Sequence, residues 1–205
     1  MIYDDFGRPV LNLRISVTQR CNLNCPYCHR EGETLSDTDS FTGEMTAEEI
    51  IRLTKISVGL GISRVKLTGG EPLLRKDILQ IVEGVANLRG LKDLSMTTNG
   101  VHLAFLAKDL KQKGLMRINV SIPSLDAKTY RNLMGGELGE VLTGVKTAVD
   151  VGLYPVKLNM LILKGVNENE VEKMISFAER TGTILQLIEL EPVNISPDYY
   201  EQHHF

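Results

Sequence analysis

Six short runs of aliphatic and β-branched residues alternate with longer helical patterns along the chain, and this alternation restricts the fold more than any other feature. The runs lie at residues 11–17, 64–68, 93–97, 117–121, 156–162 and 185–190. Repeated strand-helix-strand units form right-handed crossovers, which place successive strands parallel in one sheet. The sequence therefore predicts an α/β fold with about six parallel strands, arranged either as an open doubly wound sheet or as part of a barrel.

Residues with known capping preferences mark the ends of several helices. Thr46 and Glu49 have the spacing of a capping box. Gly114 is suited to end a helix that begins near residue 102, and Asn167 is suited to cap a helix that ends near Gly182. These signals agree with a regular alternation of strands and helices.

The polarity of the strands distinguishes a sheet from a barrel. A sheet covered by helices on both faces needs near-continuous apolar strands. The first run instead alternates apolar with polar residues, as LNLRISV at residues 11–17. Four further runs alternate in the same way, with polar side chains at Lys66, Thr68, Ser95, Thr97, Asn119, Ser121, Lys157 and Asn159. We therefore predict a partial, open βα barrel, similar to a TIM barrel, whose polar lumen surrounds a ligand.

Size and composition predict one domain, spanning residues 1–205, because 205 residues with 42% hydrophobic side chains can bury one substantial core. The formal net charge of -3 offers no broad basic surface, so nucleic acid is not an expected partner. The opening residues lack the pattern of a signal peptide, and no stretch has the length and hydrophobicity of a membrane span. We therefore expect a cytoplasmic protein without membrane contact. Residues 34–44 are predicted to form a loop.

All the cysteines fall in one short segment after the first strand, with the spacing C-x3-C-x2-C at Cys21, Cys25 and Cys28. This distribution suits metal binding in a reducing compartment better than a disulfide framework. Three thiolates can hold three irons of a [4Fe-4S] cluster and leave the fourth iron open, which makes the cluster a reaction site. A zinc site with His29 as fourth ligand is the structural alternative.

The segment CNLNCPYC at residues 21–28 resembles the signature of the radical S-adenosylmethionine (SAM) superfamily, including the aromatic residue before the last cysteine. Gly69, Gly70, Glu71 and Pro72, after the second strand, resemble the GGEP motif of the same superfamily. The resemblance implies that the cysteines hold a catalytic [4Fe-4S] cluster. It also implies that the glycine backbone, with Glu71 at the mouth of the cavity, binds the amino group of SAM. Without that context, the glycine pair would predict only a tight turn.

Longer stretches, among them VKLTGGEPLLRKD, MTTNG and INVSIPSLD, resemble the GTP 3′,8-cyclase family of molybdenum-cofactor biosynthesis. The resemblance implies a lyase that converts GTP to (8S)-3′,8-cyclo-7,8-dihydroguanosine 5′-triphosphate, through a 5′-deoxyadenosyl radical that removes the ribose 3′ hydrogen. It further implies an unidentified reductant and, as the next enzyme, cyclic pyranopterin monophosphate synthase. A homodimer is left open.

The same resemblance assigns individual residues to two ligands. It places GTP at Arg14, Lys66, Thr97 and Lys157. It places SAM at Tyr27, Gly70 and Ser121, and at Glu191, where the family has methionine. The cations suit a triphosphate, and Arg64 could assist them. Three other residues of the polar face, Ser95, Asn119 and Asn159, are predicted to make hydrogen bonds within the barrel.

Members of this family continue beyond the sixth strand, with further cysteines that bind a second [4Fe-4S] cluster. The present chain has no such cysteines and ends in SPDYYEQHHF, for which neither a strand nor a cap is predicted. We therefore expect a cyclase truncated at its C-terminus, which binds the first cluster and SAM without cyclising GTP. The alternatives are a radical SAM enzyme with a different substrate and a non-enzymatic iron-sulfur or zinc module.

Overall fold

The sheet is a single curved layer of six parallel strands in the order β1-β2-β3-β4-β5-β6. A computed structural model of the chain describes residues 2–28 and 43–205. The strands are β1 Asn12–Ser16, β2 Arg64–Thr68, β3 Asp93–Thr98, β4 Arg117–Ser121, β5 Val156–Leu161 and β6 Ile184–Ile188. Within the described ranges β1 and β6 do not pair with each other, so the barrel is open, as predicted.

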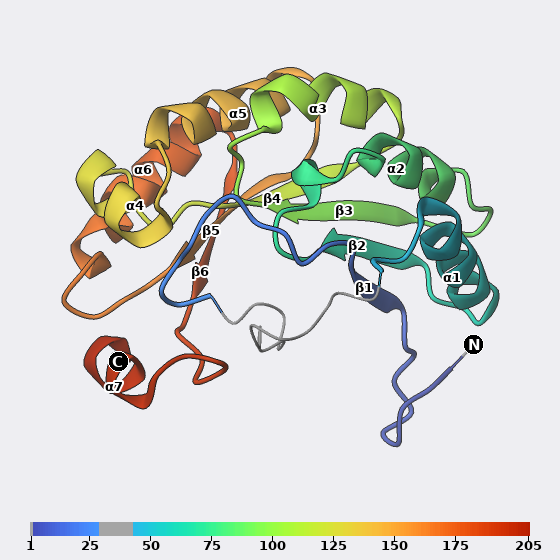
Figure 1. The fold of residues 1–205 in the computed structure, drawn as a ribbon, viewed down its shortest axis with the longest axis horizontal. Helices are drawn as coiled ribbons and strands as arrows, with labels where there is room; N and C mark the ends of the chain where they lie inside the picture. The colour runs from blue at the N-terminus through green and yellow to red at the C-terminus, as the bar shows by residue number, and fades with distance from the viewer. Residues whose placement is uncertain (1, 29–42) are drawn as a thin grey trace.

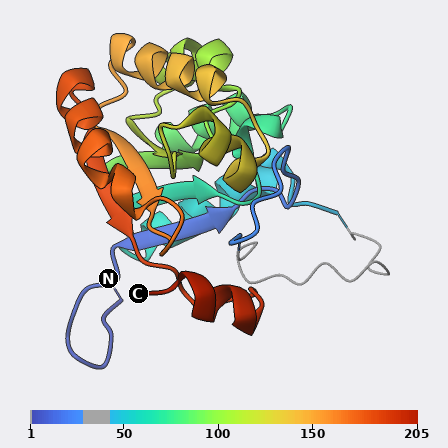
Figure 2. The same cartoon turned by 90° about the vertical axis from the view of Figure 1, so that its left-hand side faces the viewer.

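Helices cover the convex side of this sheet (Figure 1). They are α1 Ala47–Gly59, α2 Ile78–Ala86, α3 Leu103–Gln112, α4 Ala127–Met134, α5 Leu138–Asp150 and α6 Val171–Thr181, with short 3-10 turns η2 Pro72–Leu74 and η3 Glu168–Glu170. The last helix, α7 Pro197–His203, lies on the other side of the sheet, away from α3 and α5 (Figure 2).

The predicted capping box and two predicted helix ends are confirmed. Thr46 Oγ1 accepts from Glu49 N at 3.2 Å, and Glu49 Oε2 accepts from Thr46 N at 2.8 Å, which completes the capping box of α1. Gly114 follows α3 with φ +99°, and Gly182 ends α6 with φ +67°, both in the left-handed region that favours glycine. Residues 34–42 of the predicted loop lie outside the described residues.

Asn167 stands at the N-cap position of η3, which leads directly into α6, but its side chain makes no capping hydrogen bond, contrary to the prediction. Its Oδ1 accepts from Leu163 N at 2.7 Å, and its Nδ2 donates to Pro123 O at 2.7 Å and to Leu161 O at 2.8 Å. The side chain is fully buried. It fastens the segment after β4 to the end of β5. Pro123 lies 44 positions away in sequence, so a capping rule could not detect this contact.

The core lies between the convex face of the sheet and the helices. The strand side chains that point to this layer are completely buried, among them Leu67, Leu94, Met96, Ile118, Val120, Leu158 and Met160. Burial of each such side chain contributes about 1.5–3 kcal/mol relative to exposure. The apolar residues of each strand therefore determine which face of the sheet packs against the helices. The polar residues that alternate with them point to the concave side.

Polar side chains form rows across the concave face, as predicted. One row runs through Arg14, Lys66, Ser95 and Arg117 on β1 to β4. The next runs through Thr97, Asn119 and Lys157 on β3 to β5, and Ser121 pairs with Asn159 nearer the strand ends. The register thus places the residues assigned to GTP on one continuous surface.

The C-terminal segment forms a capped helix, which the sequence did not predict. Ser196 Oγ accepts from Tyr199 N at 3.1 Å at the start of α7. The helix is tied back to the loop after β5, because Lys164 N donates to His203 O at 2.9 Å. Its end is also tied to the segment after β6, where His204 Nε2 lies 2.9 Å from Glu189 Oε1.

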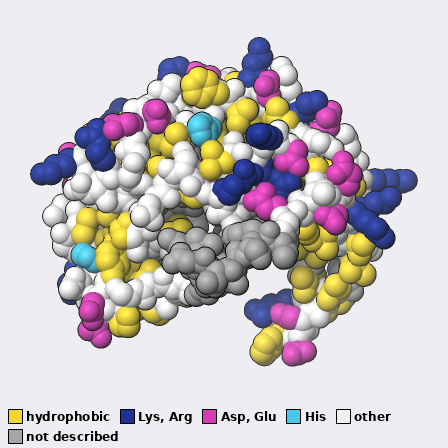
Figure 3. All heavy atoms as spheres, viewed as in Figure 1, with side chains coloured by type: hydrophobic (Ala, Val, Ile, Leu, Met, Phe, Trp, Pro, Cys, Tyr) yellow, Lys and Arg dark blue, Asp and Glu magenta, His cyan; other side chains and the backbone are white. Residues whose placement is uncertain are grey.

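The surface mixes charges of both signs. On the face in Figure 3, Lys and Arg side chains lie among Asp and Glu side chains over the helices. Among the helices of the described residues, none combines the length and hydrophobicity that crossing a membrane requires.

Candidate functional site

The cysteine loop begins directly after β1. Cys21 and Cys28 are exposed, and Cys25 is half-buried. Cys28 N donates to Cys25 O at 3.1 Å. Two N–H groups point at the Cys21 sulfur, since Leu23 N lies 3.5 Å from Cys21 Sγ and Asn99 Nδ2 lies 3.9 Å from it. Donors aimed at a sulfur stabilise its thiolate form, which is the form that binds metal.

Two of the thiols have raised pKa values. Burial, with a smaller contribution from the neighbouring Cys28 and Cys21 thiolates, raises the pKa of Cys25 to about 12. Burial also raises the pKa of Cys21, with smaller contributions from Glu71 and Cys28. The thiols thus repel one another when ionised, and a bound cation would reverse the effect because it stabilises all the thiolates at once.

These residues fit an iron-sulfur cluster in donor type and position. They are mutually interacting free thiols at the carboxyl end of a barrel strand, where reactive loops collect. Among residues 2–28 and 43–205, however, no three His, Cys, Asp or Glu side chains already form a compact metal-binding group. His29, the fourth ligand of the zinc alternative, lies outside the described residues.

The glycine loop after β2 packs directly on the cysteine loop. Gly70 N donates to Thr18 O at 2.7 Å, and Glu71 N donates to Arg20 O at 2.7 Å. A Cβ on Gly69 would lie 2.3 Å from Thr18 O, and one on Gly70 would lie 2.4 Å from Arg20 O. Gly69 also has φ +138°. Only glycine allows the two backbones to approach this closely.

Glu71 is not at the mouth of the cavity, which corrects the prediction. Its side chain is fully buried. Oε1 accepts from Leu73 N at 2.9 Å and from Thr98 Oγ1 at 2.7 Å, while Oε2 accepts from Asn99 N at 2.6 Å. Burial raises the pKa of this carboxyl, and the three hydrogen bonds oppose that rise. The buried side chain of Glu71 therefore holds the loops after β2 and β3 in position through these hydrogen bonds.

Arg75 is a further organising residue that the sequence did not reveal. Its guanidinium pairs with Asp77 through two contacts of 2.7 Å. It also donates to Val17 O at 2.5 Å and to Met45 O at 3.0 Å. The planar fork of arginine serves all four acceptors, which lysine could not do. This side chain joins the glycine loop to the end of β1.

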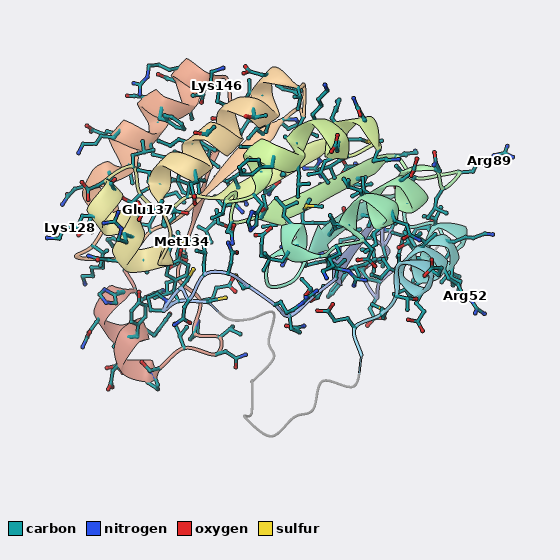
Figure 4. All side chains as sticks on the ribbon, turned by 45° about the horizontal axis from the view of Figure 1, so that its top comes forward. Arg52, Arg89, Lys128, Met134, Glu137 and Lys146 are labelled. Carbon is teal, nitrogen blue, oxygen red and sulfur yellow. The ribbon has the colours of Figure 1, made fainter. Side chains whose placement is uncertain are left out.

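The other side of the cysteine loop rests on the end of α4. Figure 4 shows Met134 there, facing the segment that follows β1. Met134 Sδ accepts from Tyr27 Oη at 2.8 Å and lies 3.5 Å from Cys25 Sγ. The turn after α4 is also close, because a Cβ on Gly136 would lie 2.9 Å from Leu23 Cδ2. Tyr27, expected at SAM, is thus held in place by a methionine.

A cavity of about 230 Å³ lies at the concave face near the first residues of β1 to β4. Its lining includes Asn12, Arg14, Arg64, Lys66, Asp93, Ser95 and Arg117. Burial lowers the pKa of Lys66, and Arg14, Arg117 and Lys157 lower it further. Arg117 donates to Asp93, with Nε 2.7 Å from Oδ1. Several cations therefore converge here, as an anionic ligand requires.

Glu191 lies beyond the sixth strand rather than at its end. The sixth strand ends at Ile188, two residues earlier than predicted, and Glu191 is exposed beyond it. Thr97, Lys157 and Ser121 are half-buried on the concave rows. These three residues therefore do lie with the predicted site.

The hydrogen bonds predicted within the barrel are found for only one residue. Ser95 Oγ donates to Val65 O at 3.3 Å. The Oδ1 atoms of Asn119 and Asn159 are buried without a partner among the described residues. Since buried acceptors are nearly always satisfied, these two oxygens are exceptions among the buried polar groups.

Comparison with known proteins gives the family. The model of the radical SAM superfamily matches residues 15–178. A protein of Thermococcus kodakarensis named "Probable GTP 3′,8-cyclase" is 53% identical over 192 residues, which cover 93% of this chain and 60% of that protein. A protein of the same name from Methanothermobacter thermautotrophicus is 45% identical over 205 residues, covering 99% of this chain and 65% of its own length. The chain thus spans less than two thirds of these relatives.

Solved structures share the fold. SuiB of Streptococcus suis, bound to S-adenosylmethionine, matches with a TM-score of 0.72 at 22% identity, over 90% of this chain and 41% of that one. HydG, a maturase of the [FeFe]-hydrogenase, matches with a TM-score of 0.72 at 19% identity, over 95% of this chain and 46% of that one. Both similarities concern the arrangement of strands and helices.

Proposed function

The chain belongs to the radical SAM superfamily, and from that premise we propose that it is the part of a GTP 3′,8-cyclase that binds the first cluster, SAM and the triphosphate of GTP. One observation carries the proposal. The cations Arg14, Lys66 and Lys157 lie on the concave face, while the cysteine and glycine loops follow the carboxyl ends of β1 and β2. A nucleoside triphosphate can therefore span from the cations toward the reactive end of the strands.

Cys21, Cys25 and Cys28 would hold a [4Fe-4S] cluster with one open iron. When bound, the cluster supplies the electron that cleaves SAM. The backbone of Gly69 and Gly70 would receive the amino group of SAM, and Tyr27 and Ser121 would contact it. The buried carboxylate of Glu71 keeps the glycine loop and Asn99 in place.

The substrate would be GTP. Lys66 and Arg14 would neutralise the triphosphate beside Arg64, while Thr97 and Lys157 would bind it from the next row. Converging cations stabilise a polyphosphate through charge-assisted hydrogen bonds. The product would be (8S)-3′,8-cyclo-7,8-dihydroguanosine 5′-triphosphate, which cyclic pyranopterin monophosphate synthase would consume. A cytoplasmic location follows from the same proposal.

Anaerobic reconstitution with iron and sulfide, followed by electron paramagnetic resonance, tests the cofactor assignment. We expect one [4Fe-4S] signal per chain that shifts when SAM is added. Retention of zinc without a cluster, or a signal that SAM does not change, would remove the enzymatic proposal.

Calorimetric titration with GTP tests the substrate assignment. Lys66→Ala should weaken GTP binding about tenfold, because a hydrogen bond to a charged group is lost. Lys128→Ala is the matched control, since Lys128 is exposed and projects outward at the edge of the molecule (Figure 4). Equal affinities of the wild type for GTP and guanosine would contradict the role of the cations and favour a radical SAM enzyme with another substrate.

A further inference from the structure

Asn119 carries a buried hydrogen-bond acceptor without a partner. The residue is 3% exposed, and its Oδ1 has no donor among residues 2–28 and 43–205. An unsatisfied buried acceptor destabilises the fold, because it loses its hydrogen bonds to water and gains none from the protein. Its neighbour in register, Lys157, does not donate to it. The fold thus retains an amide oxygen that no described protein group satisfies.

The position of Asn119 lies between the two ends of the proposed site. In the middle row it is flanked by Thr97 on β3 and Lys157 on β5. Arg117, which lines the cationic cavity, precedes it by two residues on the same strand. Ser121 follows by two residues toward the strand end. Asn119 therefore lies in the strand row between the cationic cavity and the carboxyl ends of the strands.

The chemistry of an amide oxygen restricts what can bind there. This atom only accepts hydrogen bonds, and an ionised phosphate also only accepts them. Its partner must therefore be a hydroxyl or an N–H group. In a nucleoside triphosphate, the group next to the phosphates that carries such donors is the ribose, through its hydroxyls.

We propose that Asn119 is a further substrate-binding residue, whose Oδ1 accepts a hydrogen bond from a ribose hydroxyl of the bound nucleoside triphosphate. The proposal rests on GTP binding at the concave face. It makes Asn119 the residue that distinguishes a ribonucleotide from the deoxynucleotide that lacks the same hydroxyl. Sites that bond a hydroxyl reject analogues without it, because the acceptor is then left unsatisfied.

Calorimetric titration of the cluster-loaded, SAM-bound protein with GTP, 2′-deoxy-GTP and 3′-deoxy-GTP tests this role. The wild type should bind GTP about tenfold more tightly than one of the two deoxynucleotides. Asn119→Leu should reduce that ratio to about one. Asn119→Asp, which keeps an acceptor oxygen, should retain it. Asn132→Leu on the exposed surface of α4 is the matched control.

Urea unfolding of the ligand-free protein separates binding from folding. A side chain retained for a ligand costs stability, so Asn119→Leu should unfold at the same or a higher urea concentration than the wild type. If Asn119→Leu keeps the wild-type ratio of affinities for GTP and the deoxynucleotides, or binds all three nucleotides equally more weakly, the role of Asn119 is overturned. The assignment of GTP as the substrate would not be affected by that result. A wild type that binds none of the nucleotides while its cluster still responds to SAM would overturn GTP as the substrate.

Discussion

The phenol of Tyr27 donates a hydrogen bond of 2.8 Å to the thioether sulfur of Met134, which stands 107 positions later in the sequence. The same sulfur lies 3.5 Å from Cys25 Sγ. One buried methionine thus contacts both a proposed cluster ligand and a proposed SAM contact. The position of the cysteine loop therefore depends on the end of α4 as well as on β1.

Replacement of Met134 by leucine should change the cluster without unfolding the protein. Leucine has a similar volume, so the packing cost should stay below about 1.5 kcal/mol. It offers no acceptor to Tyr27, however, and the loop should shift. We expect altered g-values and an altered reduction potential of the reconstituted cluster. Met174→Leu, equally buried in α6, is the control; identical spectra for the two variants would show that Met134 only fills space.

Replacement of Glu71 by glutamine should destabilise the loops after β2 and β3. The amide of glutamine has one acceptor oxygen, so its NH₂ group must face either Asn99 N or the Leu73 and Thr98 donors. An opposed buried donor costs about 1–3 kcal/mol. Urea unfolding should show this loss, and Glu179→Gln on the surface of α6 should not. Equal stability of the two variants would mean that the carboxylate is dispensable for the loops.

Replacement of Gly70 by alanine should separate the glycine and cysteine loops. The added Cβ would lie 2.4 Å from Arg20 O and 2.6 Å from Gln19 O, and both atoms belong to backbone. We expect a loss of about 1–3 kcal/mol and reduced iron content after reconstitution. Gly139→Ala, in α5 with nothing within 4 Å of the added carbon, should instead be neutral or stabilising. Full iron content in Gly70→Ala would contradict the close approach.

Binding of inorganic triphosphate should weaken as the pH rises. This loss should begin at a lower pH than it would for a lysine with an ordinary pKa. Burial and the nearby Arg14, Arg117 and Lys157 lower the pKa of Lys66 from 10.5, while Asp93 partly opposes the shift. Lys66 is charged below this lowered pKa and neutral above it, so its attraction for an anion is lost as pH rises through that value.

Lys66→Arg provides the comparison, because a guanidinium stays charged throughout this range. Titrations across the alkaline range should show that the variant keeps its affinity where the wild type loses it, while Lys128→Arg follows the wild type. Parallel pH profiles for wild type and Lys66→Arg would mean that another group controls the loss.

The strands were predictable because five of the six runs alternate in polarity and the runs are separated by helical patterns. β2 and β4 begin and end at the predicted residues. β6 ends two residues early, because the apolar pattern continues through Leu190, which is buried outside the strand. The polar concave face followed from the same alternation, since it depends only on which side chains share a phase.

The organisation of the site could not be predicted in the same way. Glu71 was expected to face the ligand, yet its donors Thr98 and Asn99 belong to the next strand and loop. Met134 reaches the cysteine loop from α4. The alternation of polar and apolar residues placed Asn119 on the correct face of the sheet. It does not show whether another group forms a hydrogen bond with the side-chain amide. Such contacts join segments that are distant in sequence, and they depend on how the elements pack.

The rows across the sheet have a consequence for the diversification of this architecture. Glu71, Arg75 and the glycine pair bind the first three strands and their loops into one platform. The middle row, with Thr97, Asn119 and Lys157, takes no part in those bonds. Exchange of these few side chains could therefore retarget the barrel to a different small molecule while the cysteine and glycine loops stay intact, so new specificity need not be gained by rebuilding the scaffold.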